Sequence, residues 1–434
     1  MTGAEQAMSG VAQEAAAAGR WPFWLRVAFR FACLYFGLFC LPNPAQVSLL
    51  NIVPHFGDRL GETFAEPLAA LAAWAGQHVF HLPGIAGHWH PTGSGDTALH
   101  YVLYGCVAAI AAFGTLIWTI VDRRRTEYRT CYAWLSLLLR FTLAAAMVLY
   151  GFSKVFPKQF APPGLDVLTE TYGDSTPMRL LWTFMGSSTP YRVACGLGEV
   201  LGGMLLLFRR TSTMGALLTA AIMSNVALLN FSYDVPVKLY SAHLLLVSLL
   251  LLLPDAGPIF RFFALRREAV LGGAWLPRFE SNRLRWAAHV LQGLVVVCLL
   301  LSYGVGIWES TKGPAGERSE LYGVWQVDSD PGGNGARAWQ RVYFEYQTSM
   351  MVQTSDGTQL RYSTTYLPDA HSIELRGADA NGSVEWTRPD PTHLSMAGNV
   401  GGQRLMMTMH RTSPEIFPLQ AHQFHWVHED APNH

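Results

Sequence analysis

The sequence predicts an all-α polytopic membrane helix bundle that is followed by a small all-β domain. Charged residues make up only 14% of the 434 residues, whereas soluble globular proteins average about 25%. Apolar, leucine-rich runs fill the chain up to residue 312, and short alternating segments between turn residues replace them beyond it. The mean hydropathy of only +0.18 fits an average over these two kinds of sequence.

The charges divide at the same point of the chain. The net charge is zero, but residues 1–312 hold 23 basic and 17 acidic residues, and residues 313–434 hold 8 and 14. The zero is therefore a cancellation between a basic part and an acidic part. It excludes the class of proteins that bind nucleic acid through an overall basic surface, so we expect no nucleic-acid partner.

Membrane-spanning helices need about 20 mainly apolar residues. Seven segments approach this pattern, at about 21–42, 98–121, 132–154, 190–208, 212–232, 237–254 and 285–306. The first is too long for the core of a signal peptide and no cleavage site follows it, so we interpret it as a retained span.

Basic residues alternate between the predicted loops. Arginines gather at 123–129, 209–210 and 261–285, whereas the loops on the other side hold few. Because short cytoplasmic loops carry the excess of Lys and Arg, the amino terminus is predicted to be cytoplasmic and the domain after Trp308 extracytoplasmic. We expect a multi-pass protein of a bacterial cytoplasmic (inner) membrane, in contact with membrane lipids.

Two outer loops contain amphipathic segments. In residues 66–82, Leu68, Ala72 and Ala75 share one helical face, which fits a helix that lies at the membrane interface. A second segment runs from Pro177 to Met185, where Thr176 can cap the first turn. Both segments fit either lids over a cavity or ordinary loop packing.

The part after residue 312 predicts one small antiparallel barrel or sandwich. Asp356-Gly357 and Asn381-Gly382 are dipeptides that favour hairpin turns. Gly323-Val324-Trp325 and a late Arg411 resemble the Gly-x-Trp start and the closing arginine of lipocalin-type barrels. Such a barrel either encloses an apolar ligand or is filled by its own side chains. The eight predicted strands are Trp325–Val327, Arg341–Tyr346, Met350–Thr354, Leu360–Thr365, Ser372–Leu375, Val384–Thr387, Leu405–His410 and Phe424–His428.

Polar side chains recur in the outer halves of four consecutive spans. Such residues are costly in a bilayer and usually face a partner or a cavity. Glu199 is expected to pair with Lys154 or Lys238, and Asp234 with the other lysine. The pairs either orient a tight bundle or line an outward-facing polar pocket for a small substrate or a quinone head group. The candidate pocket residues are Tyr150, Lys154, Glu199, Asn225, Asn230, Asp234, Lys238 and His243.

Other chemistry is less well supported by the sequence. His100 and His243 are conceivable axial ligands of a haem, but lone membrane histidines more often bond across helices, so haem is disfavoured. His88 and His90 lack the spacing of a metal site, and none is predicted. The six cysteines form no C-x-x-C pair, which argues against a thiol relay. Residues 94–96 are predicted to be a turn and cap that enter the second span.

The stretch from Arg140 to Asp255 resembles the DoxX-like integral membrane proteins. The matching features are Arg140, Tyr150-Gly151-Phe152-Ser153-Lys154, Gly198-Glu199 with Gly202-Gly203, and Asn225 through Asp234. The resemblance implies a four-helix core at 132–256, and in some members a quinone-linked subunit of thiosulfate oxidation or a partner of redox enzymes. Lys154 and Glu199 are the residues carried over from the family pattern. Around this core the chain adds amino-terminal spans with a long outer loop (1–131), a cytoplasmic basic loop with a last span (257–312), and the β domain (313–434).

The leading functional prediction is an accessory or redox-linked membrane component, associated with quinone and a redox enzyme partner. One alternative is a non-enzymatic envelope protein whose barrel binds a lipid or a partner. The second is a proton-coupled transporter, in which paired Lys and Glu change partners. The sequence assigns no reaction.

Overall fold

The computed structural model describes residues 20–40, 56–82, 85, 93–271, 281–311, 317–329, 338–367, 371–377, 380–412 and 417–420. The chain divides into two compact units, one formed by residues 1–155 with 193–307 and the other by 156–192 with 308–434. The predicted strand 424–428 and the histidines at 88 and 90 lie outside the described residues.

The first unit is helical, with a helix at each of the seven predicted positions. Its elements are α2 (Phe23–Phe39), α3 (Phe56–His78), α4 (Ala98–Val121), α5 (Arg129–Val155), α8 (Thr189–Leu207), α9 (Ser212–Ser232), α10 (Lys238–Leu252), η3 (Leu253–Asp255), α11 (Ala256–Phe263), α12 (Asn282–Leu299), η4 (Leu300–Val305) and α13 (Gly306–Ser310).

Five of the described helical stretches, not seven, are long and apolar enough to cross a membrane. They are Ala98–Val121, Arg129–Val155, Ser212–Ser232, Lys238–Phe263 and Asn282–Ser310. The helices that account for the difference are α2, which has only 17 residues, and α8, which carries Arg192 and Glu199. The chain therefore has a membrane-type helical region, and five of the seven predicted spans meet this criterion of length and composition.

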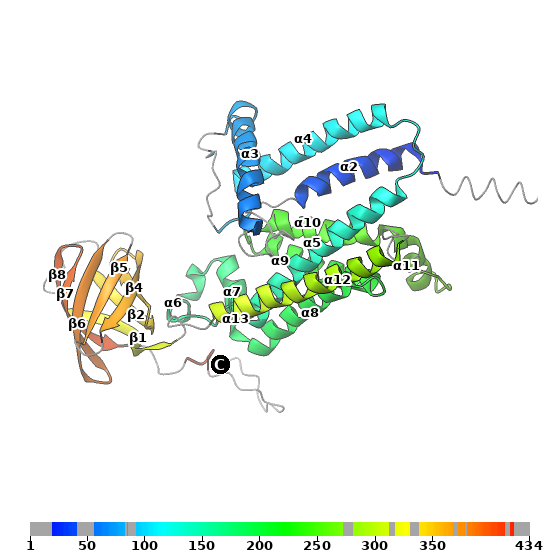
Figure 1. The fold of residues 1–434 in the computed structure, drawn as a ribbon. Helices are drawn as coiled ribbons and strands as arrows, with labels where there is room; N and C mark the ends of the chain where they lie inside the picture. The colour runs from blue at the N-terminus through cyan, green and yellow to red at the C-terminus, as the bar shows by residue number, and fades with distance from the viewer. Residues whose placement is uncertain are drawn as a thin grey trace, which may run out of the picture. The chain divides into compact units, whose positions relative to one another are not determined.

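Helix α5 is the central helix of this unit. Of its most apolar 18-residue window 67% is buried, compared with 17–39% in the other four apolar stretches. It contacts α2, α10 and η4 (Figure 1). Because most of α5 faces protein rather than solvent or lipid, its polar side chains are the ones that the fold encloses.

Helices α5 and α8 cross with their backbones in close contact. A Cβ atom on Gly151 would lie 2.7 Å from the carbonyl oxygen of Gly196, and one on Gly196 would lie 2.6 Å from the carbonyl oxygen of Gly151. The sequence predicts a Gly198–Gly202 face here, but Gly202 faces Thr219 of α9 and Gly198 meets only Ile222, at 3.7 Å. The close crossing instead depends on Gly151 and Gly196, since only glycine lets helix backbones approach so closely.

Gly196→Ala is predicted to lower the free energy of unfolding by about 1–3 kcal/mol, the usual cost of overpacking, because the added methyl group would meet the α5 backbone. Gly198→Ala is the matched control on the same helix, and it should change the stability little. Thermal unfolding in detergent measures both variants. Equal destabilisation by the two alanines would contradict the close crossing.

Buried arginines satisfy polar groups at the helix ends of this unit. Arg140 donates from Nε and Nη2 to the carbonyl oxygen of Leu206, at 2.9 and 2.6 Å, and Gln292 donates to that of Leu207 at 2.8 Å. These carbonyls belong to the last turn of α8, where a cation is favoured. Arg30 likewise donates from Nη2 to the carbonyl oxygen of Asp122 at the end of α4, at 2.8 Å, and it also donates to the hydroxyl of Tyr128, at 2.6 Å.

Helix α3 contains the amphipathic segment that the sequence places at the membrane interface. Ala72 and Ala75 pack against Val102 and Leu103 of α4, with Leu68 beside them. Figure 1 shows α3 beside α4. Much of the predicted apolar face is thus used for packing on α4 within the protein.

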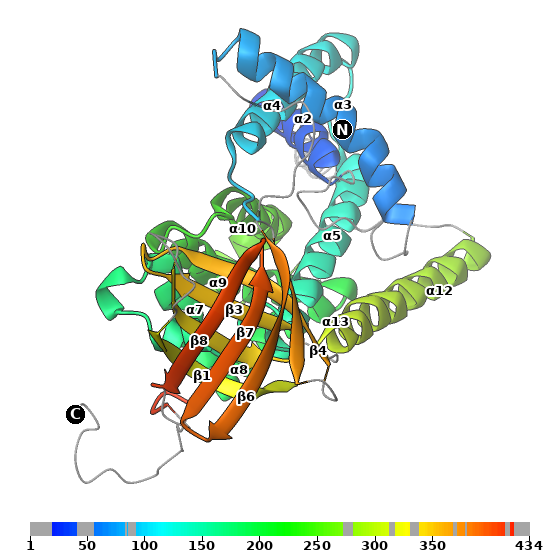
Figure 2. The same ribbon diagram turned by 90° about the vertical axis from the view of Figure 1, so that its left-hand side faces the viewer.

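The second unit contains a closed antiparallel barrel, so the sandwich alternative is wrong. Each strand pairs with its neighbour in sequence, and β1 also pairs with β8 (Figure 2). The strands are β1 (Arg318–Ser329), β2 (Trp339–Tyr346), β3 (Ser349–Thr354), β4 (Gln359–Leu367), β5 (Ser372–Gly377), β6 (Asn381–Asp390), β7 (His393–Val400) and β8 (Gln403–Arg411).

Seven of the predicted strands are present, and β7 was missed. The Asp356-Gly357 turn is confirmed, with Gly357 at φ +84°. Asn381-Gly382 was predicted as a turn but lies inside β6. Gly382 is needed there for close strand packing, because a Cβ atom would lie 2.2 Å from the carbonyl oxygen of Asn399 on β7.

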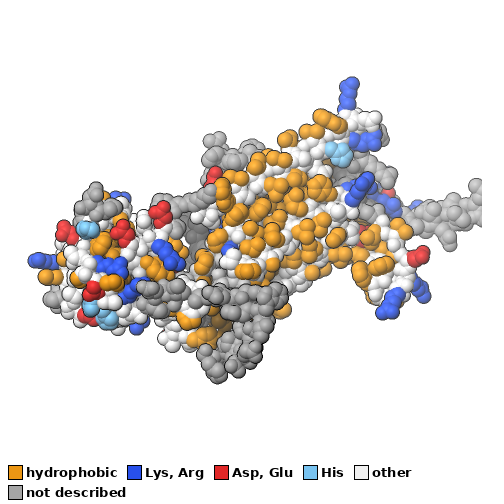
Figure 3. Space-filling model, turned by 90° about the horizontal axis from the view of Figure 1, so that it is seen from below, with side chains coloured by type: hydrophobic (Ala, Val, Ile, Leu, Met, Phe, Trp, Pro, Cys, Tyr) orange, Lys and Arg blue, Asp and Glu red, His pale blue; other side chains and the backbone are white. Residues whose placement is uncertain are grey.

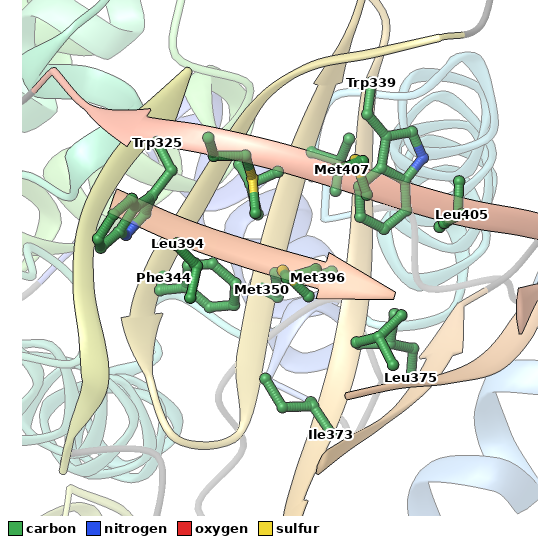
Figure 4. Close-up of a cluster of buried hydrophobic side chains, with 14 of the residues drawn as sticks. Trp325, Trp339, Phe344, Met350, Ile373, Leu375, Leu394, Met396, Leu405 and Met407 are labelled. Carbon is green, nitrogen blue, oxygen red and sulfur yellow. The ribbon is translucent and has the colours of Figure 1, made fainter. Parts of the chain in front are cut away.

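The interior of the barrel is filled by its own apolar side chains. Figure 4 shows Trp325 toward one end of this cluster and Trp339 with Leu405 toward the other. The buried members of the cluster are each only 0–8% exposed, so the described interior side chains pack against one another. Eight-stranded barrels are just wide enough to be filled in this way.

The predicted closing arginine is replaced by another residue. Arg411 is the backbone partner of Trp325 on β8, but it is Arg388 of β6 whose guanidinium carbon lies 5.6 Å from the centre of the Trp325 ring. Arg388 also donates to the carbonyl oxygens of Glu320 and Pro391. The cation over the first-strand tryptophan is therefore supplied by β6, and not by Arg411 of β8.

Residues 156–192, which link α5 to α8, fold with the barrel, and we call them the insert. The insert contains α6 (Leu165–Leu168), η2 (Tyr172–Asp174) and α7 (Pro177–Ser187), and Thr176 caps α7 as predicted. Leu165 is buried among Val324, Tyr343 and Met351 on the barrel's outer face. Two arginines, Arg361 of β4 and Arg179 of α7, approach Asp166 Oδ2, at 3.4 and 3.5 Å.

Glu345 of β2 makes this attachment pH-dependent. Its carboxylate accepts a hydrogen bond from the backbone N–H of Leu165, and burial together with the nearby Asp166 carboxylate raises the pKa of Glu345 to about 7. A native-state pKa above the ordinary value means that folding takes up a proton. The contribution to stability is therefore full below about pH 4.5 and is lost as the pH rises through about 7.

Hydrogen exchange at Leu165–Leu168, corrected for intrinsic rates, should accordingly speed up between pH 5 and pH 8 in the wild type. Glu345→Gln should remove most of this dependence, because the amide stays neutral and still accepts from Leu165. Glu374→Gln, which alters a carboxylate that is 3.7 Å from Arg376 on β5, is the control. A pH dependence that persists unchanged in Glu345→Gln would refute this assignment.

Candidate functional site

The centre of the candidate site is a buried ion pair between α5 and α8. Lys154 Nζ lies 2.8 Å from Glu199 Oε2, and the two side chains are only 8% and 4% exposed. Lys154 stands three residues after Gly151, and Glu199 stands three residues after Gly196. The close glycine crossing therefore brings the helix backbones near enough for a short, direct bond, and it resolves the predicted alternative in favour of Lys154.

Aromatic rings continue from this pair toward α10. The ammonium group of Lys154 lies 5.9 Å from the centre of the Tyr150 ring, a distance at which a cation is attracted to the ring face. The Tyr150 ring lies 6.2 Å from that of Tyr240. Tyr240 is buried on α10 and lies 6.4 Å from the ring of Phe39 on α2.

His243 stands at the far end of these rings, among aromatic side chains. Its ring lies 4.6 Å from that of Tyr104 and 4.9 Å from that of Phe39. Nδ1 is 2.7 Å from the carbonyl oxygen of Leu239, and Nε2 is 2.7 Å from the Tyr35 hydroxyl. Because a carbonyl only accepts, Nδ1 carries the proton and the Tyr35 hydroxyl donates to Nε2. Both nitrogens are thus engaged, and His243 is unsuited to ligate a haem.

The second predicted pair is formed at an exposed position. Lys238 Nζ lies 2.6 Å from Asp234 Oδ1, and the Asp234 side chain is 86% exposed. Asp234 has a φ of +52°, in the left-handed region that ends α9. This pair lies at the α9–α10 turn, apart from the enclosed Lys154–Glu199 pair.

Asp96 caps a different helix from the one predicted. Residues 94–96 are expected to cap the second span, but the Asp96 carboxylate accepts from the backbone N–H groups of Lys238 and Leu239, at 2.7 and 3.0 Å. Gly95 also donates to the carbonyl oxygen of Pro236 at 2.7 Å. The segment thus caps α10, the helix that carries Tyr240 and His243, because an anion is favoured at a helix amino terminus.

The two predicted asparagines do not behave alike. Asn225 is exposed on α9, so the structure does not bring it into the enclosed cluster. Asn230 is buried near the end of α9. The cluster therefore comprises Tyr150, Lys154, Glu199 and His243 of the predicted set, with Lys238 and Asp234 at the α9–α10 turn.

Sequence reasoning missed the aromatic residues of the cluster. Tyr35, Phe39, Tyr104 and Tyr240 come from three helices, and each was counted as ordinary apolar content. Their positions along the predicted spans could have identified them, because they lie in the same half of each span as the polar residues. A π-helical turn, η4, which contacts α5, was also missed. Such turns are rare and are frequent at functional sites.

The groups of this cluster are of the kinds that move protons and that contact planar polar rings. The pair offers a cation and a carboxylate in apolar surroundings, and the aromatic rings offer faces for stacking. Among the described residues, no group of three or more His, Cys, Asp or Glu side chains could hold a metal ion.

The chain is similar in sequence to a bacterial protein. Over 131 residues the chain is 34% identical to the uncharacterised protein YwoB of Bacillus subtilis (strain 168). The matched region is 30% of this chain and 82% of YwoB. The chain belongs to the YwoB family. Because YwoB is itself uncharacterised, the relationship assigns no activity. No family profile matches the chain, and no solved structure matches it.

Glu199→Gln is predicted to lower the free energy of unfolding by about 3–5 kcal/mol, because it leaves the buried Lys154 ammonium without its counter-charge. Asp234→Asn is the matched control. It breaks a pair that is exposed on the aspartate side, and such pairs contribute about 1 kcal/mol at most. Chemical unfolding in detergent measures both variants. Similar small losses for the two would contradict the enclosed position of Glu199.

Proposed function

We propose that this protein is a DoxX-like, redox-linked membrane component whose enclosed cluster binds a quinone head group. The observation that carries the proposal is the buried Lys154–Glu199 pair, with the Tyr150 ring beside it. The wider proposal adopts the predicted seven spans, with a four-helix core at 132–256, an amino terminus in the cytoplasm and the barrel outside.

The residues present fit a quinone. Its head group is a planar ring with carbonyl acceptors, and it reacts by taking up two electrons and two protons to give the quinol. A lysine ammonium group has three donors, so it can bond to Glu199 and to a carbonyl acceptor at once. Tyr150 and Tyr240 offer ring faces for stacking. The electrons would come from a partner redox enzyme.

The role of this chain would be to bind the ring and to manage protons. Glu199 and Lys154 are an acid and a base held in contact, so a proton can pass between Lys154 Nζ and Glu199 Oε2 when the charge beside them changes. The apolar surroundings would make the position of this proton sensitive to a nearby charge, because a low dielectric strengthens the electrostatic interaction between buried groups. The hydrogen bond between Tyr35 and His243 would hold the His243 ring in place, and His243 in turn stacks on other aromatic rings of the cluster.

The two alternative functions fit the geometry less well. A lipid-binding barrel would require displacement of the side chains that fill its interior. A proton-coupled transporter would require Lys154 or Glu199 to exchange partners, and the glycine crossing holds these two residues together.

The test separates function from stability by removing both charges. Lys154→Met combined with Glu199→Met should keep the stability close to that of the wild type, because replacing a buried pair by apolar side chains is often neutral or stabilising. The same double variant should lose quinone that the wild type retains on mild detergent purification, as measured by chromatography of the extracted lipids. Absence of quinone from the wild type, or equal retention by the double variant, would refute the proposal.

A further inference from the structure

The end of the apolar stretch Lys238–Phe263 carries an exposed cluster of aromatic and basic side chains. All residues from Phe260 to Glu268 are exposed. We call Phe260, Phe263, Leu265, Arg261, Arg266 and Arg267 the aromatic–arginine patch. The apolar members of the patch are 49–70% exposed, which is unusual for side chains that face water.

Backbone hydrogen bonds draw the patch into one compact turn. Ala264 and Leu265 both donate to the carbonyl oxygen of Phe260, at 2.9 and 3.3 Å. Arg267 then donates to the carbonyl oxygen of Arg261 at 3.1 Å. Because Arg266 has a φ of +52°, the chain turns back at this residue. Arginines that are five or six residues apart in sequence are thereby presented together.

Within the described part of the chain, the arginines of the patch have no acidic side chain as an ion-pair partner. Among the described residues, Arg261, Arg266 and Arg267 form no ion pair within 4 Å. The next span begins with Arg283 and Arg285, followed by the exposed Trp286. Consecutive spans meet on one side of a membrane, so both groups belong to the same side. In Figure 3, Lys and Arg side chains gather toward one end of the broad hydrophobic face of the helical unit.

We propose that the aromatic–arginine patch binds the head groups of anionic phospholipids in the surrounding bilayer. Exposed Phe and Leu side chains at a span end can enter the boundary between head groups and acyl chains, which places the neighbouring arginines at the level of the lipid phosphates. The planar guanidinium group binds phosphate oxygens in a bidentate manner. This lipid contact is independent of the enclosed cluster and of the quinone proposal.

The test uses the full-length protein and compares phosphatidylglycerol with phosphatidylcholine. Native mass spectrometry in detergent would measure lipid adducts at increasing lipid concentration. The wild type should retain phosphatidylglycerol preferentially. Arg261→Gln, Arg266→Gln and Arg267→Gln together should weaken this retention about a hundredfold, since each basic residue near an anionic surface contributes a factor of about five.

The matched control removes the same charge elsewhere. Arg123→Gln, Arg124→Gln and Arg210→Gln alter three exposed arginines of other basic loops, and this variant should keep much more of the preference than the patch variant. A triple Arg→Lys variant of the patch should keep part of it, which shows that the fold persists. Equal loss in the patch variant and the control variant would overturn the proposal, because net charge alone would then explain binding. A wild type without preference for phosphatidylglycerol would also overturn it.

Discussion

The buried contact between Lys154 and Glu199 is the constraint on which the helical unit depends. Removing two charges from water is costly, so the pair is tolerable only at a short distance with its partner in place. The close approach of α5 and α8 at Gly151 and Gly196 supplies that distance. Helix α5, which carries Lys154, is also the most enclosed of the five apolar stretches. The ion pair and the close helix packing therefore depend on the same two glycines.

The two helices that carry the pair are joined by the insert, which folds with the barrel. Its attachment combines an apolar residue, Leu165, with carboxylates and arginines around Asp166 and Glu345. The barrel itself is a filled module, held by apolar side chains and by Arg388 over Trp325. The insert therefore belongs to the barrel unit, although its two ends continue in sequence into the helices that carry the pair.

The two-part architecture could be predicted because long apolar runs and alternating strands leave strong periodic signals. Glu199 and Lys154 could be singled out because ionisable residues are rare in spans. The partner choice, the role of Gly196 and the cap by Asp96 could not be predicted, since each depends on contacts between distant segments. The turn predicted at Asn381-Gly382 was wrong for the same reason. Glycine occurs both in turns and where strands pack closely, and the sequence does not distinguish the two. The sequence shows which residues are polar or apolar and how they repeat. Which side chains come into contact depends on how the helices and strands cross in the folded chain.

The central claim is that Lys154 and Glu199 interact directly in an enclosed position, and a double-mutant cycle tests it most directly. The free energies of unfolding of the wild type, Lys154→Met, Glu199→Met and the double variant would be compared in one detergent. The account predicts that each single change destabilises the protein strongly and that the second change recovers most of the loss, with a coupling energy above about 1 kcal/mol. Additive losses, with a coupling energy near zero, would contradict it.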